Sequence, residues 1–366
     1  MKRKTGDKGF HNAPVLPNVR CGNSLFVVLS NPALWQDLAR FLPAGELKLL
    51  VTMKHPFSRV VGALLSVGIP LCLGCMARVQ TIAAPAAPLT VVATPTPTPI
   101  APHVVFKQDE AALNEVSGLA VVRSKPELLW MHNDSGDTAR MFAVNRSGKI
   151  AVTVNLQGAS AFDWEDCAAQ GDWVYAGDIG DNLKIRSDMQ IYRFKEPEID
   201  ASKTEVQLDL KGKQWQMMTL TWPDGARNCE SLVVTPDGRL LLVSKEESGL
   251  SGFYVWDKPF KDKSSASLRK IGSFQFGMAG MFTKLATGAD FSPDGKKLVV
   301  TTYSDLYEFP LSRPFDFASL RLVPVKSVLP PQKQCEAVCY SLDGKTIFVT
   351  SEGKNQAVWE VASALK

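Results

Sequence analysis

Five acidic residues stand at similar places in the second part of the chain, each at the opening of a short apolar run that leads through a turn to a second apolar run. They are Glu115, Glu165, Glu230, Asp290 and Glu336. They lie 46 to 65 residues apart, and the turns of the last three units read PDG or LDG. If these carboxylates converge, they form an oxygen-rich ligand site suited to Ca²⁺, which takes about six to eight oxygen ligands.

Polar residues end the second apolar runs and add further candidate ligand-binding residues. In the first and third units these are Asn133, Asp134 and Lys245. In the second unit the segment GDIGDN alternates acidic and glycine residues as Ca²⁺ loops do, so the candidate metal ligands there are Asp178, Asp181 and Asn182. The segment lacks the twelve-residue EF-hand pattern. Asp and Gly in tight turns explain the same segment without a metal.

Two side chains are candidate catalytic groups. His132 is the one histidine within the five units, and an ordinary pKa near 6.5 suits a general base. Glu165 is the other candidate base. Because no nucleophile motif is spaced with it, a hydrogen-bonded structural histidine is the preferred explanation of His132. The chain contains no GxSxG, HExxH or P-loop motif, which argues against a serine hydrolase, a zincin or a nucleotide hydrolase.

The repeated units predict the fold. Each reads as short strands rich in Val, Ile and aromatic residues, separated by Gly, Asp, Ser and Pro turns. Self-similarity at about 40–50 residues with several strands per unit is typical of a β-propeller. We predict an all-β propeller of four-stranded antiparallel blades, with five blades and six as the alternative. The last unit lacks an outer strand, and the strand HVVFKQ (103–108) is predicted to supply it and close the ring.

In such a ring the innermost strands line one channel, so the five carboxylates are expected around its axis. Like charges in a narrow channel repel unless a cation or hydrogen-bond donors compensate them. A bound Ca²⁺ is one explanation. The other is structural, with each carboxylate capping backbone N–H groups or pairing with a basic residue. The candidate basic partners are Arg140, Arg186, Arg227, Lys245 and Lys284.

The charge of the chain is unevenly distributed. Residues 1–102 hold 10 Lys and Arg against 3 Asp and Glu, whereas the remaining 264 residues hold 31 against 34. The part expected to fold is therefore mildly acidic, and binding to nucleic acid has no electrostatic support.

The basic first part contains a predicted export signal. In residues 53–75 a short basic stretch precedes an apolar run that ends at LCLGC, which resembles a bacterial lipobox with Cys75 as the lipidated residue. Cys72 stands where a leucine is usual, and ordinary cleavage or an uncleaved anchor is the alternative. Because export signals are N-terminal, Met53 is the predicted start, and residues 1–52 are predicted not to be made or to be disordered. Residues 76–102, rich in Ala, Pro and Thr, read as a tether before a propeller at 103–366.

Four cysteines remain in the propeller. They are Cys167, Cys229, Cys335 and Cys339. In an exported protein an even number suggests disulfides, and four cysteines allow three pairings that sequence does not distinguish. Cys335 and Cys339 are too far apart along one strand to bond each other. The alternative is four small buried residues beside the channel.

Seven segments carry a resemblance to a known family. WMHNDSGD, FDWEDCA, YAGDIGDN and IYRFKEPE, followed by NCESLVVTPDGRLLLVSKE, TGADFSPDGKKLVVTTY and QCEAVCYSLDGKTIFVTSEG, resemble exported bacterial propeller proteins without an assigned activity. The resemblance covers residues 112–360. More distantly, the chain is similar to TolB-type and to phytase-like or esterase-like propellers. The resemblance implies the fold and export, and it implies no reaction.

Together these patterns predict an exported, lipid-anchored propeller of the bacterial cell envelope or periplasm that binds a small ligand or an envelope protein at an acidic channel mouth, with Ca²⁺ as the candidate cofactor. The first alternative is a metal-dependent hydrolase of a phosphoester, ester or lactone, in which the cation polarises the substrate and activates water. The second is an envelope scaffold with an inert channel.

Overall fold

The computed structural model describes residues 101–366, except 201, 202, 204, 279 and 366, together with two short strands near the N-terminus. Those strands, β1 (Val19–Cys21) and β2 (Ser24–Phe26), form an antiparallel hairpin in a separate unit. The predicted export signal, the lipidation site Cys75 and nearly all of the tether lie outside the described residues. Among the described residues, no helix is both long enough and apolar enough to pass through a bilayer.

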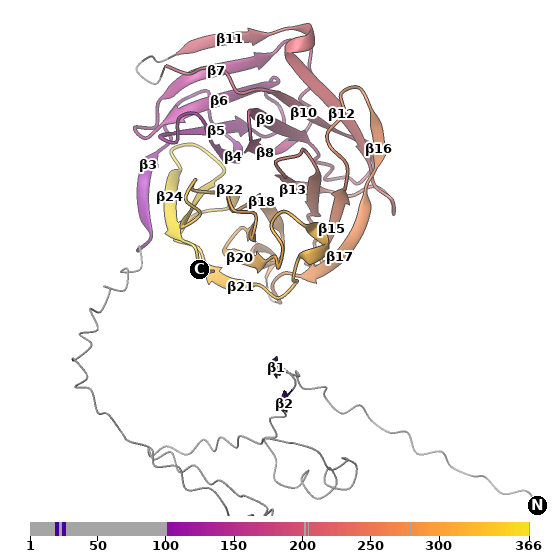
Figure 1. The fold of residues 1–366 in the computed structure, drawn as a ribbon. Coiled ribbons are helices and arrows are strands. Elements are labelled where there is room, and N and C mark those ends of the chain that lie inside the picture. The colour runs from indigo at the N-terminus through magenta and orange to yellow at the C-terminus, as the bar shows by residue number, and fades with distance from the viewer. Residues whose placement is uncertain are drawn as a thin grey trace, which may run out of the picture. The chain divides into compact units, whose positions relative to one another are not determined.

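The described residues from 101 onward form an all-β ring of five blades, as predicted (Figure 1). The first blade runs from the channel outward through β4 (Val116–Val121), β5 (Leu128–Asn133), β6 (Arg140–Asn145) and β7 (Ile150–Leu156). The second contains β8 (Trp164–Gln170), β9 (Trp173–Asp178), β10 (Met189–Lys195) and β12 (Trp215–Thr221). The third contains β13 (Cys229–Val234), β14 (Leu240–Ser244), β15 (Leu250–Trp256) and β17 (Arg269–Gln275).

The last two blades follow the same plan. The fourth contains β18 (Ala286–Phe291), β19 (Lys297–Thr302), β20 (Asp305–Pro310) and β21 (Val325–Val328). The fifth contains β22 (Cys335–Tyr340), β23 (Thr346–Ser351), β24 (Ala357–Ala362) and, as its outer strand, β3 (His103–Lys107). β3 pairs antiparallel with β24, which confirms that an N-terminal strand closes the ring.

The long second and third units contain no sixth blade. Their extra residues form two additional outer strands that pair in parallel with a neighbour. β11 (Val206–Leu210) lies beside β7 of the first blade, and β16 (Ser265–Ser267) lies beside β12 of the second blade. The segment EVQLDLKGKQWQMMTLTW (205–222) is divided between two blades. Its first half crosses to the first blade, and its second half is β12.

The blades are held together by five clusters of buried apolar side chains, one at each junction between neighbouring blades. Trp130 of β5, for example, packs at a T-shaped angle on Phe194 of β10, with ring centroids 5.9 Å apart. Because both faces of each innermost strand are covered, strands such as β4 and β22 are buried along their whole length. The ring of innermost strands is therefore a rigid frame for the side chains at the channel.

Candidate cation site at the channel mouth

All five innermost strands carry a β-bulge at the same point, near the start of the strand. The pairing register shifts there between the first strand and the second in every blade. A bulge releases a residue from the regular ladder and redirects its side chain. The residues at the five bulges are Ser117, Glu165, Glu230 with its neighbour Ser231, Thr287 and Glu336.

Two of the five predicted carboxylates are therefore not equivalent to the others. Glu115 precedes β4 and is exposed, while Ser117 occupies the bulge of that blade. Asp290 lies farther along β18 than the bulge residue Thr287. Its carboxylate accepts backbone hydrogen bonds from Phe291 (2.8 Å) and from Tyr340 of β22 (2.9 Å). Asp290 thus joins two blades, as the structural alternative anticipated, and the predicted ring of five carboxylates is corrected to three.

A second ring of side chains surrounds the first, because the second strand of each blade also ends at this mouth. The residues that follow these second strands are Asp134, Ile179, Lys245, Tyr303 and Glu352. Two of them, Asp134 and Lys245, were predicted ligand-binding residues. Acidic groups thus gather from several blades, and a lysine stands among them.

Three carboxylates form the tightest acidic group of the described residues. Asp134, Asp163 and Glu165 each offer an oxygen, and these oxygens all lie within 4.8 Å of one another. Asp163 and Glu165 are buried, and Asp134 is partly buried. Carboxylate oxygens at this spacing can share one hard cation such as Ca²⁺.

A glycine allows the two buried carboxylates to approach the backbone. A Cβ atom at Gly180 would overlap both Oδ2 of Asp163 and Oε1 of Glu165. The loop that carries Gly180 is hydrogen-bonded to Asp163. The backbone carbonyl of Asp163 accepts hydrogen bonds from the N–H groups of Ile179 and Gly180, both at 3.1 Å. The glycine therefore forms one wall of the space between the carboxylates.

On the neighbouring third blade, Lys245 compensates part of the negative charge. Its ammonium group is hydrogen-bonded to Oε1 of Glu230, and it lies 5.0 Å from the ring centroid of Tyr303. Glu230 is buried, and its other oxygen, Oε2, has no hydrogen-bond partner. An unpartnered buried carboxylate oxygen is costly unless a ligand completes it.

The pKa shifts record this excess of negative charge. Burial, together with the charge of Asp134, raises the pKa of Asp163 to about 6. Burial and the charge of Glu230 raise the pKa values of Glu165 and Glu336 well above their usual range. Burial also raises the pKa of Glu230 to about 7, in spite of Lys245 and with Asp134 and Asp163 adding to the rise. The charges of Asp134 and Asp163 therefore act on Glu230, although Glu230 lies on another blade.

Deeper in the channel, Asp166 closes the space between the innermost strands. It is fully buried, and its Oδ2 accepts backbone hydrogen bonds from Leu232 of β13 (2.8 Å) and Ala289 of β18 (3.3 Å). Its Oδ1 accepts one from Cys167 (2.8 Å). Burial raises the pKa of Asp166 well above its usual range. This carboxyl joins three blades and gives the candidate site a floor.

The predicted metal ligands of GDIGDN hold their own loop. Asp178 accepts N–H bonds from Phe162 and Asp163 and forms an ion pair with Arg186 at 2.7 Å. Asp181 accepts N–H bonds from residues 185 and 186 at 3.0 and 2.8 Å. Asn182 accepts a hydrogen bond from Asn228. Because N–H donors already occupy these oxygens, the candidate cation ligands are instead Asp134, Asp163 and Glu165.

The remaining predicted residues have structural surroundings. The side-chain amide of Asn133 donates to the carbonyl of Ala112 and to Asp137, both at 2.7 Å. His132 is fully buried between blades, edge-on to Trp164, and its Nε2 sits where a Cβ at Gly118 would be. Burial lowers the pKa of His132. The histidine therefore has no exposed nitrogen for a substrate, and the structural alternative describes it better than a general base.

The four cysteines are free thiols, and all are buried on innermost strands. Burial raises the pKa of each thiol. The suggested disulfides are not formed, and the alternative of small buried residues beside the channel is confirmed.

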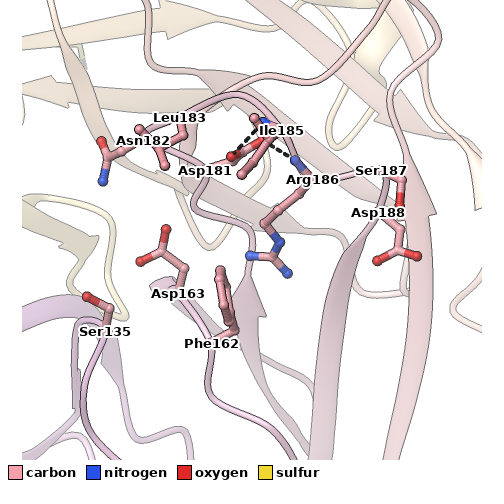
Figure 2. A pocket seen from close by; sticks show the side chains of 10 residues that line it. All are labelled: Ser135, Phe162, Asp163, Asp181, Asn182, Leu183, Ile185, Arg186, Ser187 and Asp188. Carbon is pink, nitrogen blue, oxygen red and sulfur yellow. Dashed lines mark hydrogen bonds between the residues drawn. The ribbon is translucent and has the colours of Figure 1, made fainter.

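A pocket of about 580 Å³ opens beside the acidic group (Figure 2). Asp163 belongs both to the acidic group and to the lining of the pocket. The rest of the lining comes from the two loops of the second blade and from Ser135. Its volume lies in the usual range for small-molecule sites. A cation held by Asp163 would therefore face a ligand in this pocket.

Asp163, Asp166 and Gly180 did not emerge as site residues from the sequence. Asp163 and Asp166 flank Glu165 within the DWED segment, and Gly180 lies in GDIGDN. The signal available was that both segments are unusually rich in Asp and Gly. That two separate loops meet needed the structure.

No protein-family model matches the sequence, and no curated protein matches it. Among solved structures the chain is similar to XC5397 of Xanthomonas campestris, a gluconolactonase, at 11% identity and a TM-score of 0.42, over 71% of this chain and 89% of that one. It is also similar to the PQQ-bound aldose sugar dehydrogenase of Streptomyces coelicolor, at 12% identity and a TM-score of 0.38, over 72% and 99%. At these values neither similarity supports an argument about activity.

Proposed function

We propose that this propeller binds a hard divalent cation, with Ca²⁺ the best fit, at its channel mouth, and that the cation holds a small ligand in the adjoining pocket. The observation that carries the proposal is the convergence of three carboxylate oxygens, of Asp134, Asp163 and Glu165, within 4.8 Å. The charge of Glu230, a buried neighbour whose Oε2 has no partner, adds to their repulsion. A cation held by the three carboxylates would remove that repulsion.

Lys245 explains why one ion is proposed and not several. Its ammonium group already neutralises the half of the mouth formed by Glu230 and Glu336, and both carboxylates raise its pKa against the effect of burial. The half formed by Asp134, Asp163 and Glu165 has no such group within hydrogen-bond reach among the described residues.

A second candidate function is cation-dependent hydrolysis of a phosphoester, ester or lactone. It is favoured by Glu230, whose pKa of about 7 is close to the optimum for a general base at neutral pH. In this scheme a cation held by Asp134, Asp163 and Glu165 would supply Lewis-acid polarisation of the substrate, and Glu230 would accept the proton of the attacking water. Glu165 was one of the two bases expected from sequence, with His132, but its place within the cation group makes it a ligand in this scheme.

The location of the protein is part of the proposal. The lipobox-like end of residues 53–75 and the Pro-rich residues 76–102 support an exported lipoprotein tethered to the bacterial envelope. Fractionation of cells expressing the protein and its Cys75→Ser variant tests this. A lipoprotein sediments with membranes, and the variant does not. Equal distribution of both proteins would exclude the lipid anchor.

The cation is tested by thermal unfolding of the purified full chain in EDTA and across a Ca²⁺ titration. An ion that binds only the folded state raises the midpoint with concentration, by about 2.7 kcal/mol of stability at one hundred times its Kd. Glu165→Gln should abolish the rise. Asp290→Asn is the matched control, since this carboxylate lies in an innermost strand but outside the cation group.

Three outcomes decide the proposal. A rise that is lost in Glu165→Gln and kept in Asp290→Asn supports the site. If the midpoint still rises with Ca²⁺ in both variants, the ion binds elsewhere and the proposal is overturned. No rise with Ca²⁺, Mg²⁺, Mn²⁺ or Zn²⁺ excludes both the binding function and the hydrolase, and leaves the acidic mouth as a structural or protein-binding feature.

A further inference from the structure

The pocket beside the cation group has an unusual wall of exposed apolar side chains. Phe162 is 65% exposed, Leu183 78% and Ile185 75%. All three line the same cavity as Asp163. They come from the two loops of the second blade that face the mouth, one before β8 and one after β9. Large apolar groups that converge on a polar cavity mark a binding surface more often than scattered ones do.

The loop that carries Leu183 and Ile185 is held firmly in spite of their exposure. Asp181 accepts N–H bonds from Ile185 and Arg186 (Figure 2). Between the two apolar residues, Lys184 adopts a left-handed φ of 55°, a conformation that non-glycine residues rarely take. Surrounding contacts maintain this backbone conformation. The exposed side chains of Leu183 and Ile185 are therefore held at the pocket by an ordered loop.

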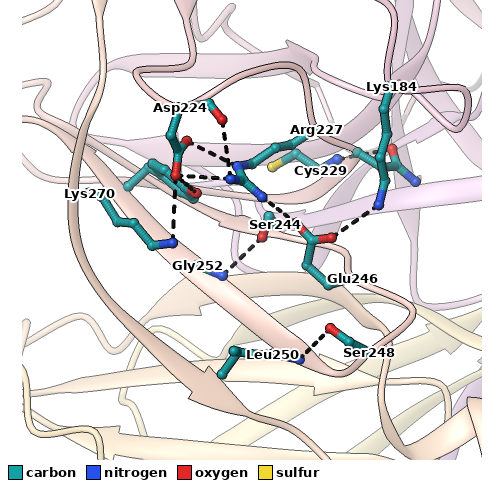
Figure 3. Close-up of polar contacts among 12 residues, drawn as sticks. Lys184, Asp224, Arg227, Cys229, Ser244, Glu246, Ser248, Leu250, Gly252 and Lys270 are labelled. Atoms are coloured by element: carbon teal, nitrogen blue, oxygen red, sulfur yellow. Dashed lines mark hydrogen bonds and ion pairs between the residues drawn. The ribbon is translucent and has the colours of Figure 1, made fainter.

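Those contacts extend to the next blade. Lys184 turns away from the pocket and pairs with Glu246 at 3.1 Å, and Glu246 is also bound by Arg227 at 2.9 Å (Figure 3). Arg227 in turn pairs with Asp224 at 2.9 Å. The ion-pair chain anchors the charged residue of the loop and leaves its two apolar neighbours on the pocket side.

Phe162 is fixed in a similar way. The guanidinium of Arg186 lies 5.0 Å from its ring centroid, and the backbone N–H of Phe162 donates to Asp178 at 3.0 Å. Arg186 is itself held by hydrogen bonds to the carbonyls of Gly180 and Asp178. One arginine therefore supports both the aromatic wall of the pocket and the loop of Gly180, which forms one wall of the cation group.

We infer that the ligand of this site is an amphiphile, with an oxyanion or polarised carbonyl head on the cation and an alkyl or acyl chain along Phe162, Leu183 and Ile185. The inference rests on the proposed cation site. Its reason is the composition of the cavity: a carboxylate of the cation group, Asp163, and three exposed apolar side chains on firmly held loops line the same space. A fully polar ligand such as a free sugar would leave that surface in water.

The test is a series of straight-chain alkyl phosphates, ethyl, butyl, hexyl and octyl, titrated calorimetrically below their aggregation concentration. Ca²⁺ is first titrated alone, which measures the cation site by itself. With Ca²⁺ present, affinity should rise with chain length, by at most about fourfold per methylene, since a buried methylene contributes about 0.8 kcal/mol. In EDTA the phosphates should bind at least tenfold more weakly.

The double variant Leu183→Ser/Ile185→Ser should flatten the chain-length dependence at least threefold while leaving the affinity for Ca²⁺ unchanged. The matched control is Val323→Ser/Val328→Ser, which removes two valines that are each 79% exposed on the fourth blade. The control should keep the full dependence on chain length. Unchanged Ca²⁺ binding in the first variant also shows that the loop remains folded.

The outcomes separate a failure of the amphiphile inference from a failure of the proposed cation site. Ca²⁺ binding with equal affinity for all four phosphates would overturn the amphiphile and leave the proposed function standing. No Ca²⁺ binding would overturn the proposed function and this inference with it. Vesicles of phosphatidylcholine with phosphatidic acid distinguish a free ligand from a lipid surface: sedimentation with vesicles, without chain-dependent binding of monomers, would mean that the wall enters a membrane, and would also overturn the inference.

Discussion

Lys245 donates a hydrogen bond to one carboxylate oxygen of Glu230, and the other oxygen of that carboxylate has no partner although the residue is only 4% exposed. The pair divides the channel mouth. On one side a positive charge is built into the protein, and on the other Asp134, Asp163 and Glu165 converge without one. A built-in cation and, beside it, an acidic group with no basic partner among the described residues make the charge of the mouth responsive to an added ion.

Lys245→Met should destabilise the protein by about 3–5 kcal/mol at pH 7.5 in EDTA, because removing one partner of a buried pair leaves uncompensated charge on Glu230. The loss should shrink at pH 5, where the carboxylates take up protons. Denaturant unfolding measures both values. Lys184→Met is the control, since the side chain of Lys184 is 40% exposed and its ion pair should contribute less than about 1 kcal/mol. Equal effects of the two changes would contradict a buried pair.

Gly180→Ala should lower the affinity for Ca²⁺ at least tenfold, because the new methyl group occupies the space of Asp163 Oδ2 and Glu165 Oε1. The fold should persist, since those side chains can rotate away. Isothermal titration of Ca²⁺ and the unfolding midpoint in EDTA separate the two effects. Gly272→Ala, whose methyl group meets only the end of Leu322, should leave Ca²⁺ affinity unchanged. Full affinity in Gly180→Ala would place the ion elsewhere.

Without Ca²⁺ the protein should lose stability as pH rises from about 4 to 7. Burial raises the folded pKa of Asp163 to about 6 and of Glu230 to about 7, so between the unfolded values near 4 and these values the folded state binds more protons. Stability therefore falls with rising pH, on the order of 3 kcal/mol from Glu230 alone. Unfolding midpoints in EDTA measure this slope, and Glu230→Gln should reduce it. A midpoint that rises with pH over this range would contradict the shifts.

Saturating Ca²⁺ should remove that loss, because the ion favours the ionised carboxylates. The apparent affinity for Ca²⁺ should accordingly increase from pH 5 to pH 7.5, with release of protons on binding. Calorimetry in two buffers of different ionisation enthalpy measures the protons released. A Ca²⁺ affinity independent of pH would exclude Asp134, Asp163 and Glu165 as the ligands.

The propeller should contain four free thiols and no disulfide. Cys167, Cys229, Cys335 and Cys339 are buried with raised pKa values, so none should react with a thiol reagent in the native protein. In denaturant all four should react, besides any thiols outside the propeller. Dithiothreitol should leave the unfolding midpoint unchanged. A midpoint lowered by the reductant would reveal a disulfide.

The blades could be predicted from the sequence because each unit repeats short apolar strands and turn residues. The alignment of the units was less secure. Matching them by acidic residues placed Asp290 at the channel, whereas the PDG and LDG turns align them correctly. The residue five places before the Ser or Thr that begins each of these turns is Glu230, Thr287 or Glu336, which are the bulge residues.

The first two blades lack such turns, so the bulge residues Ser117 and Glu165 follow only from strand pairing. The approach of Asp163 to Gly180 depends on how two loops of one blade fold over each other, and the crossings of β11 and β16 depend on parallel contacts with neighbouring blades. None of these contacts has a local pattern. The candidate site was therefore predictable as an acidic mouth, but not in its ligands.

The pairing of β3 with β24 joins the start and the end of the propeller in one blade. Roughly 250 residues separate them, and ribosomes add about 5–20 residues per second, so the first strand waits on the order of 10–50 s for its partner to be synthesised. During that interval the edge of β3 is open to other chains. The closing of the ring is thus the last strand pairing that synthesis makes possible, and the first strand of the propeller is the one exposed for longest.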